Sequence, residues 1–170
     1  KYYPKTTVFT IRDICEAFIV CVPTPEDKDG ACDDSAIRQV IEQLDTTKPI
    51  LLKSTVTPDL MHEYPDNVTY NPEFLRALHA KEDFAKQPLF VLGGNDQEQL
   101  DFWEKLFSHL NTHVVQTNRT TASMIKYTHN AWLATKVAFF HELFDNAPKD
   151  MNYSVLTAAL AQIPSIGKTH

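Results

Sequence analysis

Three short segments that carry hydroxyls or a carboxylate each follow an apolar run of the sequence. They are Pro23-Thr24-Pro25, Ser54-Thr55-Val56 and residues 71–75, which include Glu73. If the apolar runs are parallel strands of one sheet, all three segments border the crevice beyond the carboxyl ends of those strands, where ligands bind in open α/β sheets. A carboxylate beside two hydroxyls suits activation of water, because it can accept the proton that water loses. The alternative is that the hydroxyls cap the next helix and the carboxylate is only solvated.

A second pair of polar residues lies in a long stretch of helical spacing. Lys126 and Asn130 are four residues apart, so they share one face of a helix. Their neighbours, such as Met124 and Trp132, are apolar and are predicted to be buried. An ammonium and a side-chain amide at this spacing can donate hydrogen bonds to one oxygen and stabilise negative charge that develops on it. A surface pair without a role is the alternative, and the spacing by itself does not decide between them.

The elements that must position these residues alternate between strands and helices. Continuous apolar runs are typical of strands buried on both faces, as in parallel sheets. Amphipathic helices are predicted after the first run, with Asp34 or Ser35 as N-cap, and after the fourth, with Asn95 and Glu98 as a capping box. This alternation predicts an α/β fold with a doubly wound parallel sheet. The predicted strands are 17–22, 49–53, 68–70, 89–92 and 113–115.

The pattern changes in the last third of the chain. Residues 120–146 contain neither Pro nor Gly, and their apolar residues recur at helical spacing, which predicts one helix. Such a helix is far longer than the ~11–12 residues usual in globular proteins, and long helices often connect domains or pack against a partner subunit. Pro148 ends it, and a further helix is predicted over 153–163.

Composition excludes several classes of function. The net charge is −6 and the basic residues are scattered, which argues against nucleic acid or a membrane surface as the partner. No apolar run approaches the ~20 residues of a membrane span, and the first residues do not resemble a signal peptide, so a cytoplasmic protein is expected. Cys15, Cys21 and Cys32 form neither a CxxC pair nor a metal-binding pattern, so reduced thiols and no metal are predicted. Cys21 lies in an apolar run and is predicted to be buried.

Four motifs occur along the chain in the order and at the spacing of a known family. They are CVPTP, KSTV, YNPEFL and IKYTHNAWLATKVAFFHE. Together they resemble the UDP-glucose/GDP-mannose dehydrogenase family, and the likeness covers most of the chain. The resemblance implies that residues 1–118 are the C-terminal part of an NAD-binding domain, with the later part of its Rossmann-like sheet. Residues 119–170 would then be the long central helix and the beginning of a helical substrate and dimerisation domain.

The resemblance also implies an activity. Members of this family oxidise the C6 alcohol of a nucleotide sugar to a carboxylate, with two NAD⁺ per sugar. A cysteine thiolate adds to the intermediate aldehyde, a second hydride leaves the thiohemiacetal, and water hydrolyses the thioester. By this resemblance Lys126 and Asn130 stabilise the oxyanions at C6, Glu73 is the base for hydrolysis and Thr55 helps to hold the water.

Binding residues follow from the same resemblance. Thr24 and Ser54, together with Glu73, are expected to line the nicotinamide side of the NAD site. Phe74 and Leu75 fall where the family contacts the nucleotide sugar, mainly through backbone, and the catalytic lysine, asparagine and glutamate join them there. The likeness of the helix from Lys126 onward favours UDP-glucose, hence UDP-glucuronate as the product.

Several features of the family are missing from this sequence. It has no GxGxxG, and its paired glycines follow the wrong strand to supply one. All three cysteines precede KSTV, so none can be the nucleophile of the family. After NPEFL the family commonly continues Arg-Glu-Gly, whereas Ala77 and Leu78 follow Arg76 here, which removes a carboxylate that usually joins substrate binding. We therefore expect an internal fragment of a longer protein, or a degenerate relative, that is inactive alone.

Three other functions are compatible with parts of the pattern. One is a GDP-mannose 6-dehydrogenase. Another is a β-hydroxyacid dehydrogenase, which also uses Lys-x-x-x-Asn on a long helix but performs a single hydride transfer without a cysteine; the YNPEFL segment argues against it. The third is a truncated, non-catalytic module that binds a nucleotide or dimerises. The family resemblance implies a homodimer through the helix over 120–146.

Overall fold

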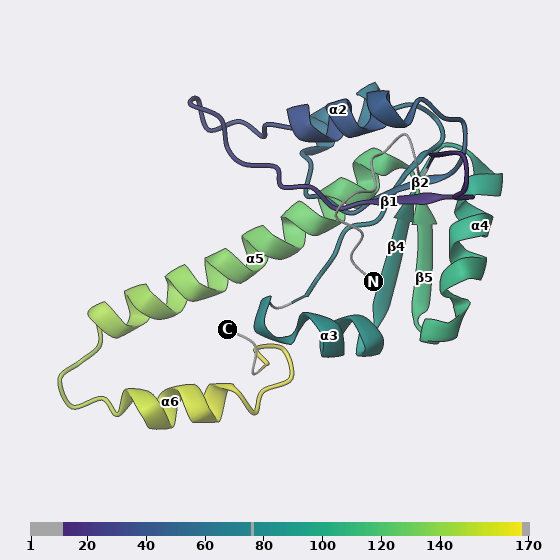
Figure 1. Ribbon diagram of the computed structural model, residues 1–170. Coiled ribbons are helices and arrows are strands. Elements are labelled where there is room, and N and C mark those ends of the chain that lie inside the picture. The colour runs from purple at the N-terminus through teal and green to yellow at the C-terminus, as the bar shows by residue number, and fades with distance from the viewer. Residues whose placement is uncertain (1–11, 76, 168–170) are drawn as a thin grey trace. The chain divides into compact units, whose positions relative to one another are not determined.

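The computed structural model describes residues 12–75 and 77–167 of the chain. Those residues form a five-stranded sheet whose strands lie in space in their chain order (Figure 1). The strands are β1 (Phe18–Val20), β2 (Ile50–Leu52), β3 (Val68–Tyr70), β4 (Leu89–Gly93) and β5 (His113–Thr117). Each lies within or extends a predicted apolar run, so the predicted α/β class with a Rossmann-like sheet is confirmed.

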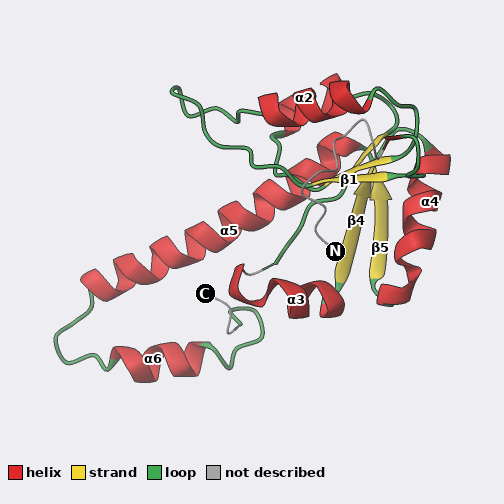
Figure 2. Cartoon of the chain, viewed as in Figure 1, coloured by secondary structure: helices red, strands yellow, loops and turns green. Residues whose placement is uncertain are grey.

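The sheet is mixed, and the prediction that it is parallel throughout is wrong in this detail. β1, β2 and β3 are parallel to one another, and β4 is parallel to β5. β3 and β4 run antiparallel and share the single pair Tyr70–Gly93, so they meet only at their carboxyl ends. The chain travels past the end of β3 through a loop and a short helix before it turns, and β4 therefore runs back toward that end (Figure 2).

Helices precede or follow most of the strands. They are α2 (Ser35–Leu44), η1 (Pro58–Glu63), η2 (Ala77–His79), α3 (Ala80–Lys86), α4 (Gln97–Phe107), η3 (Ser108–Leu110), α5 (Arg119–Asp145) and α6 (Tyr153–Leu160). The predicted long helix is thus confirmed as α5, while α6 ends three residues earlier than predicted. The predicted capping box is wrong by one residue: Asp96, not Asn95, is the N-cap of α4, and its Oδ1 accepts the backbone N–H of Glu98 at 2.9 Å.

The central strands β2, β3 and β4 are buried on both faces, as their continuous apolar runs predict, whereas the same prediction is wrong for β1, in which Ile19 is 53% exposed. Along β2, Ile50 and Leu52 belong to one buried cluster, whereas Leu51, whose side chain points to the opposite face, belongs to another. The first cluster includes Ile37 of α2 and the beginning of α5. The second includes Trp103 of α4. The carboxyl ends of the strands are therefore fixed from both sides.

A polar network holds η1 against α2. The Tyr64 hydroxyl donates to Asp34 Oδ2 at 2.6 Å, and Arg38 forms an ion pair with the same carboxylate at 2.9 Å and with Glu63 at 2.8 Å. Burial alone would raise the pKa of Asp34, but the hydrogen bonds from Arg38 and Tyr64 lower it below its usual value. Because η1 directly continues the loop after β2, this network also fixes the path of that loop.

The chain divides into two compact units, residues 1–126 and 127–170, and the division lies within α5. The predicted domain boundary at 118/119 coincides with the start of α5 instead. None of the helices formed by the described residues combines the length and the apolar character that a membrane span requires.

Candidate functional site

The loops after β1, β2 and β3 line one open cleft at the edge of the sheet. Because these three strands are parallel, their carboxyl ends meet at the same edge. The cleft has a volume of about 390 Å³. Its lining consists of Cys21, Val22, Pro23, Thr24, Lys53, Ser54, Thr55 and Glu73. The structure thus brings together the hydroxyl segments and the carboxylate that the sequence predicts to share a crevice.

Hydrogen bonds from side chains to backbone join the loops after β1 and β2. The Thr24 hydroxyl donates to the Thr55 carbonyl oxygen at 2.7 Å, and the buried Ser54 hydroxyl donates to the Val22 carbonyl oxygen at 2.6 Å. The N-cap of η1 is Thr57, so the alternative that Ser54 and Thr55 cap the next helix is wrong. The Thr55 hydroxyl makes no hydrogen bond with the residues that the structure describes, which leaves it free to bind a water molecule.

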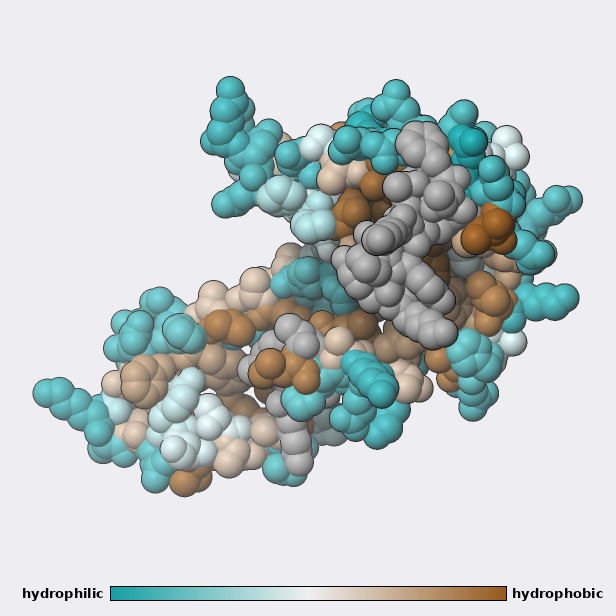
Figure 3. Space-filling view, viewed as in Figure 1, coloured by the Kyte–Doolittle hydropathy of each residue, from teal (hydrophilic) through white to brown (hydrophobic). Residues whose placement is uncertain are grey.

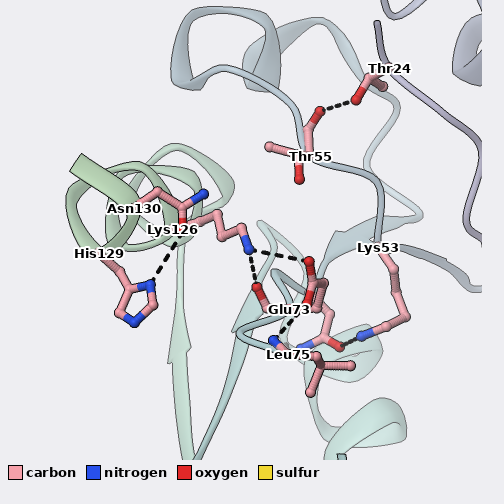
Figure 4. Close-up of polar contacts among 9 residues, drawn as sticks. Thr24, Lys53, Thr55, Glu73, Leu75, Lys126, His129 and Asn130 are labelled. Atoms are coloured by element: carbon pink, nitrogen blue, oxygen red, sulfur yellow. Dashed lines mark hydrogen bonds and ion pairs between the residues drawn. The ribbon is translucent and has the colours of Figure 1, made fainter. Parts of the chain in front are cut away.

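Lys126 reaches from α5 to the loop after β3 (Figure 4). Its ammonium donates to the backbone carbonyl oxygen of Glu73 and lies 3.3 Å from Glu73 Oε1. The other carboxylate oxygen, Oε2, accepts the backbone N–H of Leu75 at 2.7 Å. The same ammonium lies 5.6 Å from the centre of the Phe74 ring, at cation–π distance. The carboxylate of Glu73 is therefore oriented at both oxygens. It is not merely solvated, and Lys126 is not a surface side chain, so the structure does not support these two alternatives.

The beginning of α5 is packed tightly enough to determine where Lys126 lies. A Cβ atom added to Gly93 would come within 2.6 Å of Ala122 Cβ and 3.0 Å of Arg119 Cα, so only glycine allows this approach of helix to strand. Arg119 is 4% exposed and donates to the Pro65 carbonyl oxygen at 2.7 Å. The buried Ser123 hydroxyl donates to the Val56 carbonyl oxygen at 2.6 Å, which joins α5 to the loop after β2.

Asn130 lies one turn beyond Lys126 on α5, as the spacing requires, and belongs to the second unit. Its side chain is exposed, and its Oδ1 lies 3.3 Å from His129 Nδ1. The predicted burial of the apolar neighbours is wrong: Met124 is 49% and Trp132 is 59% exposed. The reason is that α5 contributes buried residues only between Arg119 and Lys126, where it packs on the sheet.

Cys21 is exposed, so its predicted burial is also wrong. β1 ends at Val20, and the cysteine lies just beyond it, at the cleft. All three cysteines are free thiols, as predicted.

The sequence predicts no role for two residues at the site, Lys53 and Asn71. The Lys53 ammonium donates to Asn71 Oδ1 at 2.5 Å, and Asn71 Nδ2 donates to the Val91 carbonyl oxygen at 2.6 Å. Burial lowers the pKa of Lys53 below its ordinary value. A lysine directly after a continuous apolar strand is the sequence signal that could have identified it, because a charge at the end of a buried strand requires a partner.

Comparison with known proteins gives a consistent answer. Residues 3–111 match a family model that is described as "UDP-glucose/GDP-mannose dehydrogenase family, NAD binding domain". A UDP-glucose 6-dehydrogenase of Rickettsia felis is 35% identical over 150 residues, which cover 79% of this chain and 34% of that protein. A GDP-mannose 6-dehydrogenase of Pseudomonas syringae is 30% identical over 147 residues, which cover 74% of this chain and 34% of that protein.

A solved structure agrees with both. The GDP-mannose dehydrogenase of Pseudomonas aeruginosa superposes with a TM-score of 0.82 at 25% identity, over 91% of this chain and 41% of that one. The chain spans about a third of the length of the two curated relatives, and these are named for different sugars at similar identity. The domain that matches is the NAD-binding one, so NAD is the cofactor. The chain belongs to the UDP-glucose/GDP-mannose dehydrogenase family, a family of NAD-dependent nucleotide-sugar dehydrogenases.

Proposed function

We propose that this chain is the central part of a longer enzyme that oxidises the C6 alcohol of UDP-glucose to the carboxylate of UDP-glucuronate. The observation that carries the proposal is the Lys126–Glu73 pair, in which an ammonium and an oriented carboxylate meet at the carboxyl edge of the sheet. Family membership favours this reaction over the single hydride transfer of a β-hydroxyacid dehydrogenase. A non-catalytic module would have no need of a carboxylate fixed at both oxygens.

The donor set at the cleft fits the nicotinamide end of NAD. The hydroxyls of Thr24, Ser54 and Thr55 lie at the carboxyl ends of β1 and β2, where a polar amide can exchange hydrogen bonds with them. Thr24 and Ser54 are themselves held by backbone carbonyls, so they offer a rigid wall. NAD supplies the hydride acceptor when it is bound. Glu73 borders the same cleft.

The residues of this chain then have distinct tasks. The Lys126 ammonium stabilises negative charge on the C6 oxygen as it loses its proton, because it is buried and contacts Glu73, which lines the cleft. The Asn130 amide donates to the same oxygen. Glu73 accepts a proton from a water molecule that the Thr55 hydroxyl holds, and that water attacks the thioester. Phe74 and Leu75 position the sugar nucleotide beside Glu73.

The preference for UDP-glucose rests on the slightly greater identity to the Rickettsia enzyme, and GDP-mannose is the rival substrate. The oxidation of a primary alcohol to a carboxylate consumes one water and two NAD⁺ and releases two NADH and three protons. We expect the full-length protein to release two NADH per UDP-glucose, and none with GDP-mannose, while the 170-residue chain alone shows no turnover. Spectrophotometric NADH assays with a limiting amount of each sugar measure this. One NADH per sugar would exclude the four-electron reaction.

We also propose that two copies pair through α5. Large apolar side chains are exposed along its second half, and Figure 3 displays apolar surface over the α5–α6 part of the chain. Trp132, Phe139 and Phe144 are 59%, 61% and 59% exposed. A Phe139→Glu variant of the full-length protein should sediment as a monomer if this face is the interface. A dimer that persists would place the interface elsewhere.

A further inference from the structure

Ser123 is a buried polar residue of α5 to which the proposed chemistry gives no task. Its side chain has 0% exposure, and its hydroxyl donates to the Val56 carbonyl oxygen at 2.6 Å. The two residues are 67 positions apart in the sequence, so this bond joins the first two turns of α5 to the loop after β2. Thr55 directly precedes Val56 in that loop. The helix therefore holds the backbone next to the residue that holds water in the proposed reaction.

Two successive carbonyl groups of this loop accept hydrogen bonds from two different elements. The Thr24 hydroxyl, from the loop after β1, donates to the Thr55 carbonyl oxygen at 2.7 Å (Figure 4), and the Ser123 hydroxyl donates to the carbonyl oxygen of the next residue. Because a peptide unit is planar, these bonds restrict the two planes on either side of Val56. On the other side of Thr55, the hydroxyl of Ser54 is bonded to the loop after β1. The backbone of Thr55 is thus held before and after the residue.

Lys126 lies one turn beyond Ser123, but other contacts determine its place. The helix is packed where Ala122 approaches Gly93, and the Lys126 ammonium contacts both the backbone and the side chain of Glu73. None of these contacts involves the loop after β2. Loss of the Ser123 hydroxyl should therefore loosen the loop that carries the threonine and leave the ammonium where it is.

We propose that Ser123 is a positioning residue for Thr55: from the helix, it fixes the loop whose threonine hydroxyl holds the water for thioester hydrolysis. The proposal rests on the proposed function, in which Thr55 binds that water. Orientation supplies much of the advantage of a bound nucleophile, so a small displacement of the hydroxyl slows its attack. The two hydride transfers precede this attack and do not use the water, so they should proceed as before.

The test compares Ser123→Ala with the unaltered sequence in the full-length protein, in a single turnover with UDP-glucose and excess NAD⁺. Absorbance of NADH follows the two oxidations, and mass spectrometry of quenched samples follows the decay of the acyl adduct. We expect the decay to slow by about tenfold in Ser123→Ala, while the rates of NADH formation stay within about twofold. Ser123→Cys, which is similar in size and keeps a weak donor, should slow the decay less.

Thr112→Val is the matched control. The Thr112 hydroxyl also donates to a distant backbone carbonyl, that of Gln87 at 2.7 Å, but this bond lies at the amino ends of β4 and β5, away from the cleft. Each variant loses one such bond and should have a lower Tm, and only Ser123→Ala should slow the decay of the adduct. If Ser123→Ala lowers Tm and leaves both rates unchanged, Ser123 serves stability alone and the proposal is wrong. An equal slowing of NADH formation and adduct decay would show that Ser123 acts on the whole site, which also overturns the proposal.

A Thr55→Val variant separates the role of Ser123 from the role of Thr55. If it hydrolyses the thioester at the original rate, the proposed task of Thr55 fails, whatever Ser123 does. If Thr55→Val slows hydrolysis and Ser123→Ala does not, only the inference about Ser123 fails. In the double variant, Ser123→Ala should add no further slowing, because the hydroxyl that it positions is already gone. A slowing by the full product of the two single effects would contradict the proposal.

Discussion

Substitution of Lys126 by Ala in the full-length protein lowers kcat for UDP-glucose by about 100-fold to 1,000-fold and raises KM far less. This range is typical for the loss of one group that stabilises developing negative charge, because its contribution is largest in the transition state. Lys126 is suited to that task because it is buried, with 7% exposure, where its charge is poorly screened by solvent. Steady-state NADH production at saturating NAD⁺ measures both constants.

Lys136→Ala is the matched control for this experiment. Lys136 lies on the same helix and donates to the Ile166 carbonyl oxygen at 3.1 Å, outside the cleft of the first unit. It should leave kcat within about twofold, because alanine is well accepted in helices and no proposed catalytic group is lost. An unchanged kcat in Lys126→Ala would remove this lysine from the chemistry.

Substitution of Glu73 by Gln stops the enzyme after the oxidation steps. The amide keeps the shape of the side chain and can still accept from the Leu75 N–H, but it cannot accept a proton from water. General-base catalysis typically contributes about 100-fold to 10,000-fold, so steady-state turnover should fall by such a factor. Both hydride transfers precede hydrolysis, and we therefore expect a rapid burst of two NADH per active site, followed by slow release.

Rapid mixing with excess UDP-glucose measures the burst, and mass spectrometry of the quenched protein detects the accumulated acyl adduct. Glu104→Gln serves as the control, because Glu104 of α4 accepts a hydrogen bond from Gln116 of β5, away from the cleft. Full steady-state turnover in Glu73→Gln would show that another group activates the water.

The sequence alone predicts which segments meet at the cleft, because one rule about the ends of parallel strands is enough. The apolar runs before Thr24, Ser54 and Glu73 are continuous, which is typical of strands in a parallel sheet, and the runs before Ser54 and Glu73 are buried on both faces. Parallel strands end at one edge, and the three segments meet there in the structure. The length of α5 follows from the absence of Pro and Gly over 120–146.

Other features depend on which strands are neighbours, and no local pattern encodes this. The Lys53–Asn71 bond needs β2 beside β3 in the register that pairs Leu52 with Tyr70. The direction of β4 depends on how α3 and its loop lead the chain back, and α3 itself buries no residue, which leaves it without a strong amphipathic signal. Cys21 is exposed because β1 ends one residue before it, and strand ends are the least certain part of such predictions.

Gly93 helps to determine where the backbone of Lys126 lies. The contact between β4 and α5 has no side chain on the strand side, so the axis of the helix is set by main-chain atoms that cannot change rotamer. Lys126 lies one turn beyond Ala122, the residue that touches this glycine. The close contact therefore fixes where the backbone of Lys126 lies, and the side chain reaches Glu73 from that position. Homologous sequences should accordingly keep glycine at this position of the strand, because a Cβ atom there would also meet the backbone of Asn118 and Arg119, which no smaller side chain on the helix can relieve.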